Sequence, residues 1–373
     1  MTETQALWSQ LSAWLVLGGA FACALPLGAT LAAARYCTLG AVSDWCLLGD
    51  TRRLRMWAAA AGSAVLGVYL LEHWADANLT ATLVPYASPH FAWPRYIAGG
   101  FVFGIGMHLA GGCASRQLQR LGGGSLKAAL ALAVAAVTAA WLIDGGGYRS
   151  WLAPLLDAGR VDLRAFGLPD QRLGTLLGFE PDGPGARLTA LIAGNSLLLV
   201  AAGFSRHRLT RLEWLAGIGL GTAVGAGWWL TAGPLGQAWQ EDMAFLDALP
   251  RGVGAQSYTF ISPLADLAGL ARGRGSLTFG LCGAAGLVTG SLAWHWRRGR
   301  LRLERHRDAR DLLRTVLGGA LLAFGGVTAL GCTVGQGVTG LSTLALGSML
   351  ATLATVAGAA SAIRLEYAWI GAD

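Results

Sequence analysis

Two segments, GGFVFGIGMHLAGGC (residues 99–113) and GGALLAFGGVTALGC (residues 318–332), decide the fold of this chain. Both are apolar and rich in glycine, and both approach the length of a helix that crosses a bilayer. Each ends on Gly-Cys, with a glutamine four residues after the cysteine. At the offset of 219 that matches Cys113 with Cys332, the second copy repeats Gly99, Gly100, Gly106, Ala110, Gly112, Cys113 and Gln117. The pattern indicates one membrane helix, ending on a thiol, that occurs twice through duplication.

The composition of the whole chain agrees with a membrane environment. Its 373 residues are 54% hydrophobic and only 13% charged, with a mean hydropathy of +0.49. Soluble domains carry about 25% charged residues, so the composition excludes an ordinary soluble domain. The 55 glycines favour close helix packing and interrupted helices. We therefore expect an all-α integral membrane protein with short re-entrant helices.

Apolar windows and loop charges predict the topology. Nine crossings are expected, at 11–34, 56–74, 95–112, 125–144, 186–204, 214–232, 276–294, 315–331 and 341–363. The connections alternate between two classes. The basic class comprises 50–55, 113–127, 205–211 and 297–314, and the class poor in net positive charge comprises 75–94, 145–185 and 233–275. By the positive-inside rule, we expect the N-terminus outside and the C-terminus in the cytoplasm. The net charge of +7 is then explained by the orientation of the chain in the membrane and not by nucleic-acid binding.

This topology inverts the second copy of the repeat. The third crossing ends at Cys113 and the eighth ends at Cys332, and an odd number of crossings separates them. We expect a single membrane domain with two inverted halves, about 1–185 and 186–373. Inverted halves with broken helices are typical of transporters, whose substrate site lies where the halves meet.

Three cysteines stand in polar, glycine-containing turns rather than in apolar runs. They are Cys37 in RYCTLGAVSDW, Cys113 in GGCASRQLQRLGGG and Cys332 in GCTVGQGVTGLS. Irregular backbone at membrane depth is tolerated where it lines a cavity. A thiol there is a soft, polarizable contact, and the N–H groups at the start of a helix favour an anion. The turns therefore predict a path for a soft, sulfur-containing anion.

Four segments in order resemble the YeeE/YedE family of bacterial inner-membrane proteins, whose characterised members take up thiosulfate. They are RYCTLGAVSDWCLLGD (35–50), the stretch from GGC to RLGGGSLKA (111–128), SYTFISPLADLAG (257–269) and GCTVGQGVTGLSTLALGS (331–348). The resemblance implies a bacterial inner-membrane transporter in which thiosulfate passes Cys37, Cys113 and Cys332 through S–H···S hydrogen bonds. It implies no cofactor and no ATP hydrolysis by the protein itself. A small cytoplasmic sulfur-carrier protein is an expected partner, and the basic stretch 295–314 is its expected docking surface.

The predicted pathway also includes residues next to the thiols. Glycines would bring backbone N–H groups to the anion, and a guanidinium and an amide would meet its oxygens; these residues are Gly112, Gly331, Gly335, Gly337, Arg116 and Gln336. Gln336 has an alternative task, which is to bind a carbonyl left free at the helix end. Arg116 stands where the second copy has Gly335, so the two halves differ chemically.

Two other classes of function stay open. The cysteines could form persulfides or disulfides in a thiol-redox or sulfane-sulfur relay, although the chain has no CxxC pair. Alternatively, the protein could bind a sulfur compound and signal to a cytoplasmic partner. No catalytic residue or metal ligand is predicted, and His108 is interpreted as a paired core histidine rather than a metal ligand.

Overall fold

The computed structural model describes residues 3–74, 79, 86–181, 183–203, 208–243 and 252–370. Almost all regular structure in this part of the chain is helical. The long helices are α1 (Glu3–Ala33), α3 (Arg52–Trp74), α4 (Trp93–Ala110), α6 (Leu126–Ile143), α9 (Pro184–Ala202), α10 (Arg211–Ala232), α13 (Phe279–Arg297), α14 (Ala309–Thr328) and α15 (Leu346–Ile370). Each overlaps one of the nine predicted crossings, which confirms the all-α prediction.

Short helices connect the long ones. They are α2 (Thr38–Ser43), η1 (Asp44–Leu48), α5 (Ala114–Gly122), η2 (Tyr148–Leu152), α7 (Ala153–Leu156), η3 (Leu163–Phe166), α8 (Leu173–Leu176), α11 (Pro234–Asp242), α12 (Ser262–Ala271) and η4 (Gly335–Gly340). Two-residue strands β1 (His90–Phe91) and β2 (Val161–Asp162) pair antiparallel.

Eight segments of the described chain are long and apolar enough to cross a membrane. They correspond to the predicted crossings except the seventh, where α13 ends on the polar sequence His295-Trp296-Arg297 and is not among the eight. α13 packs along α1 nonetheless, like the spans around it. The chain is an all-α membrane protein.

Local sequence explains where several helices begin. Ser125, Thr278 and Asp308 each accept a hydrogen bond from a backbone N–H of the first turn of α6, α13 and α14. Proline lies in the first turn of α4 and α9, where its missing N–H costs nothing.

The two repeat helices, α4 and α14, pack directly on each other and run in opposite directions. Gly99 in the first half of α4 lies against Ala329 just past the end of α14, and Gly318 in the middle of α14 lies against Ala110 at the end of α4. A Cβ atom at Gly99 would be 2.4 Å from the backbone nitrogen of Ala329. The repeated glycines therefore allow this close crossing, and α15 covers the other side of α4.

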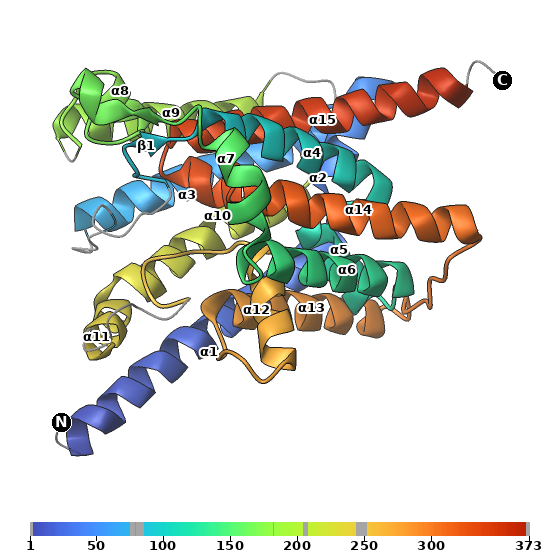
Figure 1. Ribbon diagram of the computed structural model, residues 1–373, viewed down its shortest axis with the longest axis horizontal. Helices are drawn as coiled ribbons and strands as arrows, with labels where there is room; N and C mark the ends of the chain where they lie inside the picture. Colours follow the sequence, from blue (N-terminus) through green and yellow to red (C-terminus); the bar gives the residue numbers. More distant parts are fainter. Residues whose placement is uncertain are drawn as a thin grey trace.

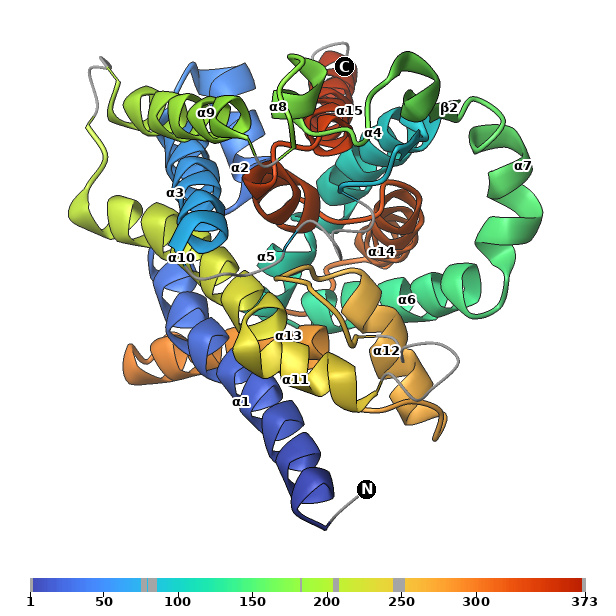
Figure 2. The same cartoon turned by 90° about the vertical axis from the view of Figure 1, so that its left-hand side faces the viewer.

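The molecule has two distinct ends along its longest axis (Figure 1). The loop-rich end, on the left, carries α8, α11 and the β1–β2 pair, and α1 begins there. The arginine-rich end, on the right, carries the connection 298–308 between α13 and α14, and α15 ends there. Figure 2 looks onto the loop-rich end and shows α5 near the middle, between α3 and α10 on one side and α6 and α14 on the other. Several residues used for the topology prediction (75–78, 80–85, 204–207 and 244–251) lie outside the described residues.

Candidate functional site: three thiols at the starts of short helices

Each of the three predicted thiols sits at a point where a helix begins. Cys37 and Cys113 are the N-cap residues of α2 and α5, and both have extended backbone conformation. Cys332 lies three residues before η4. The first N–H groups of a helix carry a partial positive charge, so the three starts offer donors to an anion.

Two of the thiols already accept backbone hydrogen bonds. The Gly40 nitrogen donates to the Cys37 sulfur at 3.4 Å, and the Gly335 nitrogen donates to the Cys332 sulfur at 3.3 Å. Cys113 differs, because its sulfur lies 3.2 Å from the Ser115 hydroxyl. All three sulfurs are thus held in place by donors or hydroxyls of the following turn.

The structure brings the three cysteines into one region. Cys113 lies within electrostatic range of both Cys37 and Cys332, and Thr38, next to Cys37, lines the same cavity as Cys332. The Arg116 guanidinium also acts on Cys37. Cys113 and Cys332 are buried and Cys37 is half-buried. In the described chain, the remaining cysteines, Cys23, Cys46 and Cys282, form no disulfide with these three.

A small cavity of about 60 Å³ adjoins Cys332. It lies between α2, α3 and α15, and its wall includes Thr38, Trp57, Cys332, Thr333 and Thr352. The hydroxyl oxygens of Thr333 and Thr352 are buried and have no hydrogen-bond partner in the described part of the chain. Buried hydroxyls usually bind protein or water, so these two are available to oxygen atoms of a small ligand.

The turn after each repeat helix has the same hydrogen bonds in both copies. The Gln117 amide donates to the Ala110 carbonyl at 2.7 Å, and the Gln336 amide donates to the Ala329 carbonyl at 2.6 Å. The Gly112 nitrogen bonds to the Met107 carbonyl, and the Gly331 nitrogen bonds to the Gly326 carbonyl, both at 2.8 Å. Of the two predicted tasks for Gln336, this geometry matches the binding of a carbonyl at the helix end.

The predicted glycines differ in how much space they have. A Cβ atom would lie 2.7 Å from Arg116 at Gly112, 2.5 Å from the Thr259 hydroxyl at Gly335 and 2.8 Å from the Trp57 ring at Gly337. Gly331 is less crowded, with its nearest contact at 3.0 Å. Arg116 therefore has no possible counterpart at Gly335, and the asymmetry seen in the sequence has a steric cause.

A salt bridge holds the turn that follows Cys113. Arg120 binds both carboxylate oxygens of Glu304 at 2.9 Å, and Ser125 donates to the same carboxylate at 2.6 Å. Burial raises the pKa of Glu304, but the hydrogen bonds from Ser125 and Arg120 outweigh it and hold that pKa below its usual value. The basic connection 298–308 is thereby fixed to the Cys113 segment.

Two of the thiols share a short sequence pattern. Cys37 and Cys332 both begin a C-T-x-G pattern, Cys37-Thr38-Leu39-Gly40 and Cys332-Thr333-Val334-Gly335. In each, the glycine nitrogen donates to the cysteine sulfur, and the threonine lines the 60 Å³ cavity. Tyr86 also belongs to this region, since its hydroxyl donates to the Gly335 carbonyl at 2.8 Å. Nothing in the spacing of Tyr86 pointed to that contact.

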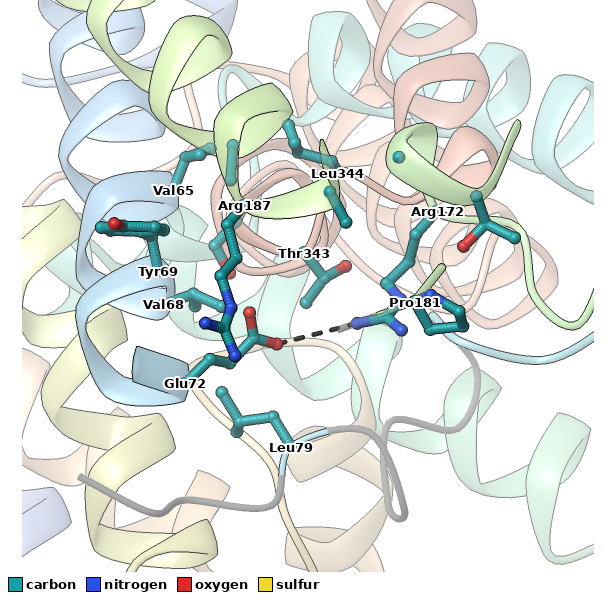
Figure 3. A pocket seen from close by; sticks show the side chains of 15 residues that line it. Val65, Val68, Tyr69, Glu72, Leu79, Arg172, Pro181, Arg187, Thr343 and Leu344 are labelled. Atoms are coloured by element: carbon teal, nitrogen blue, oxygen red, sulfur yellow. Dashed lines mark ion pairs between the residues drawn. The ribbon is translucent and has the colours of Figure 1, made fainter. Parts of the chain in front are cut away.

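A second pocket, of about 130 Å³, lies at the loop-rich end (Figure 3). Arg172 and Glu72 face each other across it at 3.8 Å, and Arg187 projects toward them. Arg172 is also bound to Asp170 at 2.8 Å. The Arg172 charge is therefore compensated by carboxylates of the protein.

His108 is paired, as interpreted from the sequence. Its Nε2 atom lies 2.6 Å from the Glu366 carboxylate, which also binds Arg314. Within the described residues, no three His, Cys, Asp or Glu side chains are grouped as they would be around a metal ion.

Comparisons with known proteins agree with these observations. A family model described as sulphur transport matches residues 33–361. A protein of Spirochaeta thermophila named thiosulfate transporter TsuA is 28% identical over 293 residues, which are 74% of this chain and 76% of that protein. An Escherichia coli protein of the same name is 30% identical over 118 residues, which are 32% of this chain and 31% of that protein.

Proposed function

This chain belongs to the sulphur transport family, and from that premise we propose that it takes up thiosulfate, or a closely related sulfur anion, across the bacterial inner membrane. The names of its relatives support this substrate. The observation that carries the proposal is the gathering of three thiols at helix starts, with the turns of Cys37 and Cys332 lining one small cavity. Donors and soft sulfur atoms in one buried region suit an anion with both oxygen and sulfur ends.

We propose the same three cysteines as successive sites for the anion. The Gly40 and Gly335 nitrogens donate to two of the sulfurs, so these sulfurs accept from the backbone and their S–H groups can donate to an arriving anion. The free hydroxyls of Thr333 and Thr352 add partners for its oxygens beside Cys332. No covalent step on the sulfurs is needed for passage.

We propose that the loop-rich end faces the periplasm and the arginine-rich end faces the cytoplasm. The basic connection at 298–308 and the positive-inside rule support this orientation. The opposite directions of α4 and α14, and their matching terminal hydrogen bonds, support two inverted halves of one membrane domain. The halves would divide near residues 185 and 186.

Uptake into proteoliposomes that contain the purified protein tests the proposed function. We expect radiolabelled thiosulfate to accumulate faster than in empty liposomes, and unlabelled thiosulfate to compete better than sulfate. Binding without accumulation would support a sensor instead. Mass spectrometry of protein recovered during turnover separates a third case, because a sulfane-sulfur relay predicts an added sulfur atom on Cys37, Cys113 or Cys332.

The expected carrier-protein partner is a separate proposal. Arginines dominate 295–314, and an acidic surface on a partner would match them. The exposed Arg300, Arg305 and Arg307 are suitable for a pull-down, since none forms a side-chain ion pair in the described chain. Capture that is unchanged when these three are replaced by glutamine would contradict this docking surface.

A further inference from the structure

A larger cavity, of about 560 Å³, opens at the loop-rich end between the ends of α4, α6 and α14 and the start of α12. Arg95, Tyr148 and Arg149 line it, together with Ser262, Leu330 and Gly331. Gly331 also lines the small cavity that holds the Cys332 thiol. The backbone at Gly331 therefore lies between the large cavity and the small cavity at the Cys332 thiol.

Arg95 is held rigidly at the wall of this cavity. Its Nε atom donates to the Thr328 carbonyl at 3.3 Å and lies 3.8 Å from Asp157. Its guanidinium stacks over the Tyr148 ring, 4.1 Å from the centroid, and the Tyr148 hydroxyl donates to Asp157. The polar contacts both use Nε, so within the described chain the two terminal amino groups of Arg95 bind no protein oxygen. The side chain is ordered in advance and keeps donors for a ligand.

Arg149 adds a second positive charge to the same wall. It is exposed and forms no ion pair or side-chain hydrogen bond in the part of the chain that the structure describes. Asp144 is the acidic residue of this wall, and Asp157 pairs with Arg95 at its Nε atom, so the terminal amino groups of Arg95 and the Arg149 guanidinium remain for a ligand. Two arginines at one cavity suit an oxyanion, because a guanidinium binds two oxygens at once.

The repeat supplies an internal comparison. Arg314 stands 219 residues after Arg95, at the same place near the start of α14, and lines a cavity of about 340 Å³ at the arginine-rich end. There Arg314 binds Glu366 at 2.6 Å through a terminal amino group, and His108 contacts the same carboxylate. The Arg172 pocket of Figure 3 is compensated in the same way, by Asp170 and Glu72. Of Arg95, Arg172 and Arg314, only Arg95 has no carboxylate at its terminal amino groups within the described residues.

We propose that the Arg95–Arg149 cavity is a capture site for a divalent oxyanion, which it binds before the anion reaches Cys332. Two parts of this proposal rest on the proposed function: thiosulfate as the ligand, and the periplasm as the side to which the cavity opens. The guanidiniums bind the three oxygens, which leaves the terminal sulfur free to approach the Gly331–Cys332 turn. In the matching cavity at the other end, the counterpart Arg314 already binds the Glu366 carboxylate, so it does not offer the same terminal donors to an anion.

Concentration-dependent uptake in proteoliposomes tests this site. Arg95→Gln removes a charge-assisted contact worth about 1.5 kcal/mol or more, so we expect the half-saturating thiosulfate concentration to rise about tenfold or more. The maximal rate should stay within about twofold, since the thiols are unchanged. Arg149→Gln should produce a smaller rise, and Arg95→Lys an intermediate one. Arg160→Gln, which removes an exposed charge from the same end, should leave uptake as in the wild type.

Equilibrium binding of radiolabelled sulfate to the detergent-solubilised protein provides a readout that does not depend on transport. Sulfate has the oxygens of thiosulfate without its terminal sulfur, so it should bind the wild type weakly and lose that binding in Arg95→Gln. If the wild type takes up thiosulfate while Arg95→Gln and Arg149→Gln match it in half-saturation and in sulfate binding, the capture site is wrong and the proposed function stands. If the wild type takes up no thiosulfate, the proposed function fails, and sulfate binding still decides the site. Should Arg95→Gln fail to fold, Arg149→Gln carries the test, because the Arg149 side chain forms no ion pair or hydrogen bond with the described residues.

Discussion

At the scale of single residues, the glutamines after the two repeat cysteines are structural. Gln336 binds the Ala329 carbonyl and accepts from the Ser348 hydroxyl, and both contacts are buried. We expect Gln336→Leu to lower the free energy of unfolding by about 1–3 kcal/mol, because it leaves two buried polar groups without partners. Thermal unfolding in detergent measures the loss. Gln237→Leu, which breaks one half-buried bond to Ala232, is the matched control and should cost less; equal losses would contradict the role given to Gln336.

A second residue, Glu304, predicts a dependence of stability on pH. Its pKa is lowered in the folded protein, so its contribution to stability is complete above the ordinary carboxyl pKa of about 4.3 and is lost as the pH falls through the lowered value. We expect the unfolding temperature to fall with acidification below that pH, and to fall less in Glu304→Gln. Unfolding curves recorded between neutral and acidic pH measure this difference. Parallel pH profiles for the two proteins would show that Glu304 does not contribute in this way.

At the scale of elements, the crossing of α4 and α14 depends on glycine. A methyl group at Gly99 would meet backbone atoms of α14 at 2.4 and 2.9 Å, which rigid helices cannot relieve by rotating a side chain. We expect Gly99→Ala to cost about 1–3 kcal/mol. Gly18→Ala in α1 is the control, since a methyl group there meets nothing within 4 Å and should be neutral or slightly stabilising. Equal stability of the two variants, measured by thermal unfolding, would mean that the helices do not cross this closely.

Helix positions were predictable from sequence, but the shape of the broken segments was not. Apolar windows locate the long helices because a bilayer requires about 20 apolar residues. The π-helix η4 has no such signal. Before η4, matching residues of the two copies are 219 positions apart, and after η4 they are 220 positions apart. Leu126 and Leu346 show the new spacing, because the backbone nitrogen of each donates to a carbonyl of a distant segment, Glu304 and Gln171 respectively. One inserted residue gives a π-type turn, and only the structure reveals where the extra residue is accommodated.

At the scale of the whole molecule, the sequence suggests the three thiols as candidates, but it does not reveal what surrounds them. The Gly-Cys repetition and the family resemblance pointed to Cys37, Cys113 and Cys332. The cavity walls come from residues far apart in the chain, such as Trp57 and Thr352, and Arg95 reaches the end of α14 only through the helix crossing. Contacts of this kind depend on packing between helices, which one sequence without its relatives does not encode in any local pattern.

The central claim is that a sulfur anion crosses the protein along the three thiols, and Cys113 connects the other two. The most direct measurement is the initial rate of thiosulfate uptake by proteoliposomes containing Cys113→Ser, with Cys46→Ser as the matched control. A hydroxyl is a harder and smaller contact than a thiol, so we expect uptake by Cys113→Ser to fall about tenfold or more, while Cys46→Ser keeps the wild-type rate. Wild-type uptake by a correctly folded Cys113→Ser would contradict the claim.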